Sequence, residues 1–239
     1  MILPKILVKY HKSIKGAILS RLAVCVISGG MDSALSAKIA QNEGYEVIGV
    51  HFNYLQRTEQ RELKAFRDVT KALGISHVYE IDLPFFADIG ASALTDSSIE
   101  VPTGGIEAGV PITYVPFRNG IFLSIAASIA EKEGAEAIYI GVVEEDSSGY
   151  PDCTEEYITQ MERAINLGTK KETNISIRMP LVHLSKKDIV LKALELGVPL
   201  ECTWSCYKNS EKACGVCDSC RLRLKGFETA EAKDPIPYC

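Results

Sequence analysis

The sequence has no long apolar run, no excess of basic residues and no low-complexity tract, and each absence excludes a class of protein. No apolar stretch approaches the roughly 20 residues of a membrane-spanning helix, which excludes an integral membrane protein. Asp and Glu number 31 against 26 Lys and Arg, so the net charge of −5 gives no support to a basic nucleic-acid-binding surface. A chain of 239 residues with 46% hydrophobic content suits one large globular domain with a small appendage.

Two common nucleotide-binding motifs are also absent. The chain has no G-x-x-x-x-G-K-S/T, which excludes a Walker-type loop, and no G-x-G-x-x-G follows a predicted strand, which leaves a dinucleotide fold unsupported. Three of the four histidines fall in or beside predicted strands and one lies near the N-terminus, so none is assigned to acid–base catalysis. These residues are His11, His51, His77 and His183.

The first 21 residues carry Lys and Arg throughout and lack the uninterrupted apolar core of a signal peptide. We therefore do not expect export, and we predict a cytoplasmic protein with an N-terminal extension over residues 1–21. A transit peptide is the alternative interpretation of this basic start.

From Leu22 onward, short apolar runs alternate with segments whose apolar residues recur at helical spacing. The predicted strands are Leu22–Ser28, Glu46–Phe52, Ser76–Leu83, Glu136–Val143 and Ile177–Leu184. The predicted helices are Asp32–Glu43, Thr58–Leu73, Arg118–Glu133, Thr154–Leu167 and Ser185–Leu196, the last capped by Ser185 and Gly197. Continuous apolar strands separated by helices indicate a parallel sheet covered on both faces, so the predicted fold class is doubly wound α/β.

Two stretches break this alternation. Pro84–Pro116 is rich in Gly, Pro and Thr and is too long for an ordinary connection, which predicts a lid or substrate loop. The tail beyond Pro199 has no strand–helix pattern and contains most of the cysteines. We therefore predict a main α/β domain over residues 22–199 and a small C-terminal subdomain over residues 200–239.

The first predicted strand runs directly into the turn Ser28-Gly-Gly-Met-Asp-Ser33, and a helix follows. Two glycines let the backbone approach an anion closely, and the helix N-terminus points its free N–H groups there. The hydroxyls of Ser28 and Ser33 are further donors. Asp32 repels a phosphate, so we expect it to hold a magnesium ion or to brace the loop. A plain strand–helix turn with serine caps is the alternative.

Six of the eight cysteines fall between Cys202 and Cys239. Closely spaced cysteines in a reducing cytosol are metal ligands more often than disulfide partners. The spacing C-x7-C-x2-C-x2-C suits one tetrahedral ion, and four thiolates without histidine predict one structural zinc per chain, with an iron–sulfur cluster as the alternative. The predicted ligands are Cys206, Cys214, Cys217 and Cys220.

The other four cysteines receive no metal role. Cys25 lies in the apolar first strand and is predicted to be a core residue. Cys153 lies in a polar loop and is a candidate for the edge of a pocket. Cys202 and Cys239 lie outside the tight spacing and are interpreted as incidental.

The motif SGGxDS resembles that of the pyrophosphatase-loop ATP enzymes. These enzymes cleave ATP between the α- and β-phosphates and adenylate an oxygen that a nitrogen or sulfur nucleophile then displaces. The resemblance implies that ATP, with Mg²⁺, binds at Ile27, Ser28, Gly29, Gly30, Met31, Asp32, Ser33, Ala34 and Leu35. Asp32 and Ser33 are the catalytic candidates in the loop, and Lys186 is a candidate for stabilising the leaving charge. A solvated lysine at a helix start is the alternative for Lys186.

Further motifs narrow the resemblance. These are SALTD (92–96), IEVP (99–102), TYVPFRN (113–119), SSGYPDC (147–153), NLGTK (166–170), PLVHLSK (180–186), TWSCY (203–207) and CGVCDSC (214–220). Together they look like the 7-cyano-7-deazaguanine synthase family, over a match from Leu22 to Tyr238. The resemblance implies an ATP-dependent carbon–nitrogen ligase that adenylates 7-carboxy-7-deazaguanine, amidates it with ammonia and dehydrates the amide with a second ATP. It also implies a zinc held by the four cysteines, a homodimer, and no direct contact with nucleic acid or membrane.

A flat deazaguanine needs an apolar wall and polar groups for its edge. Tyr114, Phe117 and Tyr150 are candidates for the wall. The polar candidates are Arg118, Asn119, Asp152 and Lys170, among which Arg118 or Lys170 would clamp the carboxylate. In the plainer interpretation, Asn119 caps a helix and Asp152 shapes a turn.

The chain departs from the family pattern after the second strand. Asn53 and Leu55 stand where Asp and Gly are expected in FDYGQR, whereas Gln56, Arg57 and Glu62 are retained. The two departures are the motive for an alternative, a paralogue that amidates or conjugates a different carboxylate. An ATP-binding regulatory module and a tRNA thiolase with an iron–sulfur cluster are the remaining alternatives.

Overall fold

The structure, a computed structural model, describes residues 21–104, 109–144 and 149–239. Of the predicted N-terminal extension only Arg21 lies among the described residues. The chain forms a five-stranded sheet of order β3-β2-β1-β4-β5 in which every pairing is parallel. The strands are β1 (Arg21–Val26), β2 (Tyr45–Asn53), β3 (His77–Asp82), β4 (Ala137–Tyr139) and β5 (Ser176–Arg178). The doubly wound α/β prediction is confirmed.

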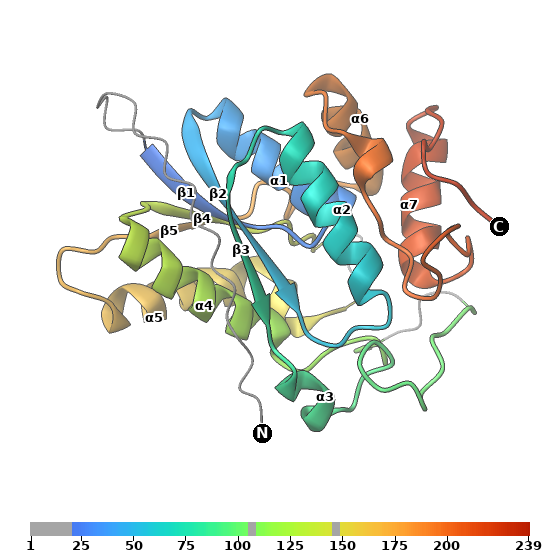
Figure 1. Ribbon diagram of the computed structural model, residues 1–239, viewed down its shortest axis with the longest axis horizontal. Coiled ribbons are helices and arrows are strands. Elements are labelled where there is room, and N and C mark those ends of the chain that lie inside the picture. The colour runs from blue at the N-terminus through green and yellow to red at the C-terminus, as the bar shows by residue number, and fades with distance from the viewer. Residues whose placement is uncertain (1–20, 105–108, 145–148) are drawn as a thin grey trace.

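Helices cover both faces of this sheet (Figure 1). One layer contains α1 (Met31–Asn42), α2 (Glu59–Ala72) and α6 (Lys186–Glu195), and the opposite layer contains α4 (Arg118–Glu133) and α5 (Glu155–Gly168). The helix α7 (Asp218–Thr229) packs against α6. The short elements are α3 (Phe85–Ile89) and the 3-10 turns η1 (Pro151–Cys153) and η2 (Leu200–Cys202).

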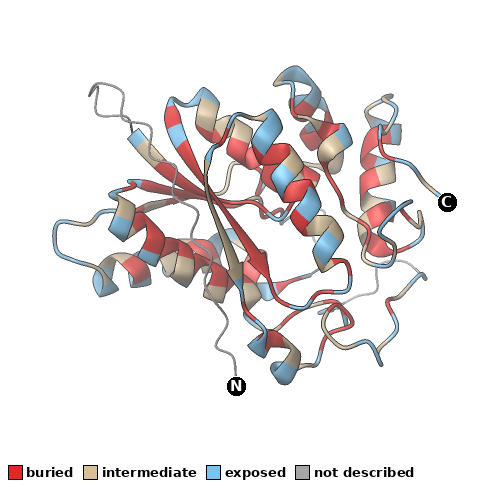
Figure 2. Ribbon diagram, viewed as in Figure 1, coloured by how far each residue is buried: buried red, intermediate tan, exposed pale blue. Residues whose placement is uncertain are grey.

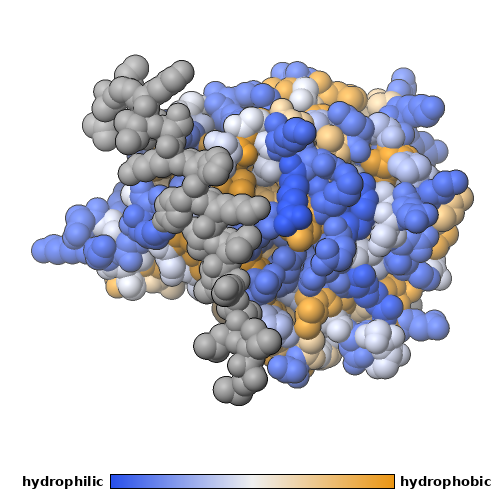
Figure 3. Space-filling view, viewed as in Figure 1, coloured by the Kyte–Doolittle hydropathy of each residue, from blue (hydrophilic) through white to orange (hydrophobic). Residues whose placement is uncertain are grey.

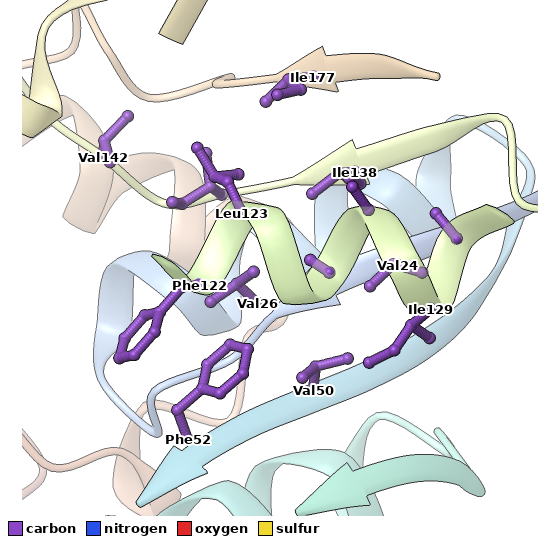
Figure 4. Close-up of a cluster of buried hydrophobic side chains, with 14 of the residues drawn as sticks. Val24, Val26, Val50, Phe52, Phe122, Leu123, Ile129, Ile138, Val142 and Ile177 are labelled. Carbon is purple, nitrogen blue, oxygen red and sulfur yellow. The ribbon is translucent and has the colours of Figure 1, made fainter. Parts of the chain in front are cut away.

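Alternate residues of β1 face opposite layers. Val24 and Val26 pack with α4 and α5, as Figure 4 shows for the α4 side, whereas Ala23 and Cys25 pack with α1 and α6. The strands β1, β2 and β4 are therefore buried on both faces, which accounts for their continuous apolar runs (Figure 2). The prediction that Cys25 is a core residue is confirmed, since its exposure is 1%.

The fourth and fifth predicted strands extend several residues beyond the observed ones. The fourth ends at Tyr139 and the fifth at Arg178. In the fifth, Pro180 follows closely and has no N–H to donate to a ladder, so the segment turns instead. The serine cap is confirmed, because Ser185 Oγ accepts the Asp188 N–H at the start of α6 (3.2 Å).

The sequence of the tail showed no strand–helix pattern and predicted no helix there, but α7 occupies Asp218–Thr229. The buried positions of α7 include Asp218, Arg223 and Gly226. Its inward face is therefore not uniformly apolar, and the sequence shows no helical repeat of apolar residues there. Arg223 is buried because Asp234 accepts two hydrogen bonds from its guanidinium, at 2.8 and 2.9 Å.

The surface in Figure 3 is largely hydrophilic over α2, in keeping with the charged outer face of that helix. Among the described residues, no helix is both long enough and apolar enough to cross a membrane.

Candidate active site

The site lies where the sheet changes winding direction. From β1 the chain moves outward through β2 and β3, and it then returns to place β4 on the other side of β1. Ligands of such sheets bind beyond the carboxyl ends of the strands at this switch point. The two elements meet tightly here, since a Cβ on Gly141, after β4, would lie 2.8 Å from the Asp32 carbonyl carbon.

Hydrogen bonds of its own serine hydroxyls fix the conformation of the turn Ser28–Ser33. The Ser28 N–H donates to Ser33 Oγ (3.1 Å), and Ser33 Oγ donates to the Gly30 carbonyl oxygen (3.1 Å). No side chain caps α1 at Gly30, so the first N–H groups of the helix remain available to an anion. Gly29 has φ +92°, and a Cβ there would lie 2.7 Å from the Glu62 carbonyl oxygen, so only glycine fits.

Lys186 joins this turn from the start of α6. Its Nζ lies 2.6 Å from Asp32 Oδ2, and its side chain is only 12% exposed. The other oxygen, Asp32 Oδ1, is buried without a hydrogen-bond partner. A Cβ on Gly226 of α7 would lie 3.0 Å from the Lys186 carbonyl oxygen, so the close contact between α6 and α7 fixes the position of the Lys186 backbone.

A cavity of about 280 Å³ extends from this turn. The predicted site residues that line it are Ile27, Ser28, Gly30, Met31, Asp32, Ser33, Arg118, Asn119, Tyr150 and Lys186. Cys153, the candidate for a pocket edge, also lines it, as do Leu94 and Thr113 from the long insert. The turn and the Arg118 region, far apart in the sequence, therefore share one cavity.

Three residues predicted to bind ATP do not line the cavity. The Gly29 carbonyl oxygen accepts the Trp204 N–H (2.9 Å). Ala34 and Leu35 lie on the inner face of α1 and are fully buried in the core. We therefore infer a structural role, on the side of the turn away from the cavity, for Gly29, Ala34 and Leu35.

Two polar candidates for the substrate are placed elsewhere. Asp152 is 3% exposed, and its Oδ2 accepts the Asn119 N–H (2.9 Å) at the start of α4, so it caps that helix. The Lys170 N–H donates to Glu131, 13 residues along α4 from Arg118. That is about 20 Å at 1.5 Å per residue, so Lys170 lies at the opposite end of the sheet from the cavity.

Aromatic rings surround Arg118 at the far end of the cavity. Its guanidinium lies 5.6 Å from the Tyr54 ring centroid and 6.0 Å from that of Tyr150. One guanidinium nitrogen donates to the Tyr54 hydroxyl (3.0 Å), while Nε is buried without a partner. Tyr114 and Phe117 do not line the cavity, so Tyr150 is the predicted wall residue that does.

Sequence reasoning assigned no role to several residues that line the cavity: Tyr54, Glu62, Trp204, Ser205, Tyr207, Asp218 and Ser219. Burial raises the pKa of Tyr54 to about 12 and that of Tyr207 well above its usual value. The motif TWSCY contained three of these residues, but the motif alone gave no indication that this segment contacts the turn Ser28–Ser33, which we call the phosphate turn.

Asn53 and Leu55, the two departures from the family pattern, do not line the cavity either. Asn53 Nδ2 donates to Asp82 at the end of β3 (2.8 Å). Leu55 is 51% exposed and has φ +59°, a left-handed conformation that suits glycine. The substitutions therefore leave the lining of the cavity unchanged.

The four predicted metal ligands come together. Their Sγ atoms lie within 4.8 Å of one another, and Cys214 and Cys220 are 3.9 Å apart. Tetrahedral zinc with bonds of about 2.3 Å separates thiolates by about 3.8 Å, so the donor set fits that ion. N–H groups of Lys208, Asn209 and Cys214 point at Cys206 Sγ at 3.3–3.4 Å, as suits a thiolate.

The family model described as Queuosine biosynthesis protein QueC matches residues 22–231. The chain belongs to the QueC family. A relative in Sulfurovum sp. (strain NBC37-1), named 7-cyano-7-deazaguanine synthase, is 72% identical over 92% of this chain and 99% of its own length. A protein of the same name in Aliarcobacter butzleri (strain RM4018) is 69% identical over 92% and 96%. QueC membership confirms the predicted resemblance and decides against a regulatory module or a tRNA thiolase.

Among solved structures, a 4-thiouridine synthetase–RNA complex with bound ATP resembles this QueC-family chain. The TM-score is 0.50 at 20% identity, over 88% of this chain and 50% of that chain. The chain thus spans half of the larger protein, and the likeness shows a shared fold.

Leu55→Gly tests the strain at the family's glycine position. We expect the free energy of unfolding to rise by about 1 kcal/mol relative to Leu55→Ala, because both variants remove the exposed side chain and only glycine relieves the left-handed backbone. Urea denaturation measures both. Equal stability of the two variants would contradict the strain at this position.

Proposed function

We propose that this chain converts 7-carboxy-7-deazaguanine and ammonia to 7-cyano-7-deazaguanine, with ATP as co-substrate. As a QueC-family enzyme it is a carbon–nitrogen ligase of queuosine biosynthesis. The reaction adenylates the carboxylate, displaces AMP with ammonia to form an amide, and then adenylates and dehydrates the amide. The observation that carries the proposal is the single cavity that joins the phosphate turn to the aromatic pocket of Arg118.

ATP is proposed to place its phosphates at the phosphate turn, where the free N–H groups of α1 are donors and the Ser33 hydroxyl would exchange the Gly30 carbonyl oxygen for a phosphate oxygen. Lys186 would stabilise the charge of the departing pyrophosphate. Asp32 Oδ1, buried and without a partner, suits a Mg²⁺ ion bound with the nucleotide. That ion would neutralise phosphate charge.

At the far end, Arg118 is proposed to hold the substrate carboxylate through its unpartnered Nε. Tyr54 and Tyr150 would flank the deazaguanine ring, and Asn119 would bind its polar edge. Asp152 acts through the helix start that carries Arg118 and Asn119, and we assign no substrate contact to Lys170.

We further propose one structural zinc per chain at the cysteine cluster, a homodimer of two such chains, and a cytoplasmic location. Four buried or partly buried thiolates leave no open coordination position, so the ion would fold the segment and take no part in the reaction.

The function is tested with purified protein, 7-carboxy-7-deazaguanine, ATP, magnesium and ammonium, followed by mass spectrometry. We expect the amide first and the nitrile later, both dependent on ATP. The control is Lys170→Met, which lies outside the cavity and should form product at the normal rate. Neither amide nor nitrile from a protein with intact metal content would contradict the proposal.

Cys217→Ser tests the metal. Because a structural zinc contributes directly to folding, we expect lost metal and a lower melting temperature, whereas Cys239→Ser, which changes an exposed cysteine, should keep both. Elemental analysis of the unmodified protein should give about one zinc per chain. Iron in its place would overturn the zinc assignment, and normal melting of Cys217→Ser would overturn the structural role.

A further inference from the structure

Glu62 is an acidic residue in a cavity that must receive two anions. Both ATP and 7-carboxy-7-deazaguanine carry negative charge. Asp32 and Asp218 also line the cavity, and Asp32 is already in contact with Lys186. The side-chain hydrogen bonds of Glu62 go to neutral groups instead. A carboxylate in this position opposes substrate binding unless a cation or a proton donor joins it.

The side chain of Glu62 is held in one position. Thr58 Oγ1 donates to Glu62 Oε1 (2.7 Å), and Gln56 Nε2 donates to Oε2 (3.1 Å). Both donors are almost fully buried, at 3% and 4% exposure. Each carboxylate oxygen therefore has one lone pair occupied and another that can accept a further donor.

Glu62 lies between the two ends of the cavity. Its carbonyl oxygen packs against Gly29 of the phosphate turn, where a Cβ would come within 2.7 Å. Burial raises the pKa of the Glu62 carboxyl, while the hydrogen bonds from Thr58 and Gln56 and the charge of Arg118 oppose that rise. Because Glu62, Arg118 and the turn line one cavity, an acyl group held by Arg118 and activated at the turn would lie beside this carboxylate.

The proposed reaction requires a group with these properties. The nitrogen donor is a cation at neutral pH, and it becomes a nucleophile only after losing a proton. We propose that Glu62 is a catalytic residue that binds the ammonium ion and accepts its proton beside the activated carboxylate. This inference rests on the proposed function and adds to it the residue that receives the nitrogen donor.

The protons balance in each half of the reaction. The ammonium ion gives one proton to Glu62, the nitrogen attacks the acyl carbon, and the bond from that carbon to the AMP oxygen breaks. A second N–H proton leaves as the amide forms. After the amide oxygen is adenylated by the second ATP, loss of two N–H protons and of AMP gives the nitrile. Glu62 accepts one proton at a time and returns it to solvent.

Glu62→Gln keeps the shape of the side chain and removes its basicity. We expect kcat/KM for ammonium to fall at least about 100-fold, with KM for 7-carboxy-7-deazaguanine unchanged. The rise of kcat/KM with pH through the pKa of this carboxyl should disappear. Asp68→Asn, on the outer face of the same helix and paired with Lys64, is the matched control and should behave as the unmodified enzyme.

Two assays separate the proton transfer from the other steps. Exchange of labelled pyrophosphate into ATP, which depends on the deazaguanine but not on ammonia, should persist in Glu62→Gln. Hydroxylamine is neutral near pH 7 and attacks without prior deprotonation, so hydroxamate formation should be nearly unchanged. Glu62→Asp should recover part of the ammonium-dependent rate.

Loss of the exchange reaction together with a raised KM for the deazaguanine would overturn the proposal, because Glu62 would then bind the N–H edge of the ring. Equal losses with ammonium and hydroxylamine would also overturn it. If the unmodified enzyme makes neither amide nor nitrile, the proposed function itself fails, and that outcome does not depend on any Glu62 variant.

Discussion

The hydrogen bond from the Trp204 N–H to the Gly29 carbonyl oxygen joins the C-terminal segment to the phosphate turn. Gly29 has a left-handed backbone and packs on α2, so its peptide is fixed from two sides. The same segment continues to Cys206, whose carbonyl oxygen lies 3.2 Å from Thr58 Oγ1. The cysteine cluster therefore contacts both the start of α2 and the phosphate turn, and a metal bound by the cysteines would also shape the wall of the cavity.

The arrangement also explains how one small cavity would bind two anionic substrates. Cationic side chains lie at separate places, Lys186 beside the turn and Arg118 among aromatic rings, and each would bind a different anion. Glu62 lies between them on the first turns of α2. Because desolvation strengthens charge interactions, this spacing favours a phosphate at one end and a carboxylate at the other.

Sequence patterns predicted the features that depend on local chemistry. The apolar runs, the turn after β1 and the cysteine spacing each follow from short stretches of chain, and the structure confirms the fold and brings the four sulfurs together. Features that depend on distant contacts were missed. Asp152 caps α4 from another segment, Lys170 lies at the wrong end of the sheet, and α7 buries a charged residue, Arg223, because Asp234 lies beside it. None of these partners is visible from spacing alone.

In the proposed reaction, the phosphate turn activates a carboxylate held at the Arg118 end of the same cavity. The most direct measurement uses 7-carboxy-7-deazaguanine labelled with oxygen-18 in its carboxylate, with ATP and ammonium, and follows the label in the nucleotide products by mass spectrometry. Adenylation transfers a carboxylate oxygen to the α-phosphate, so AMP should carry the label. Unlabelled AMP, or formation of ADP and phosphate in its place, would contradict the account.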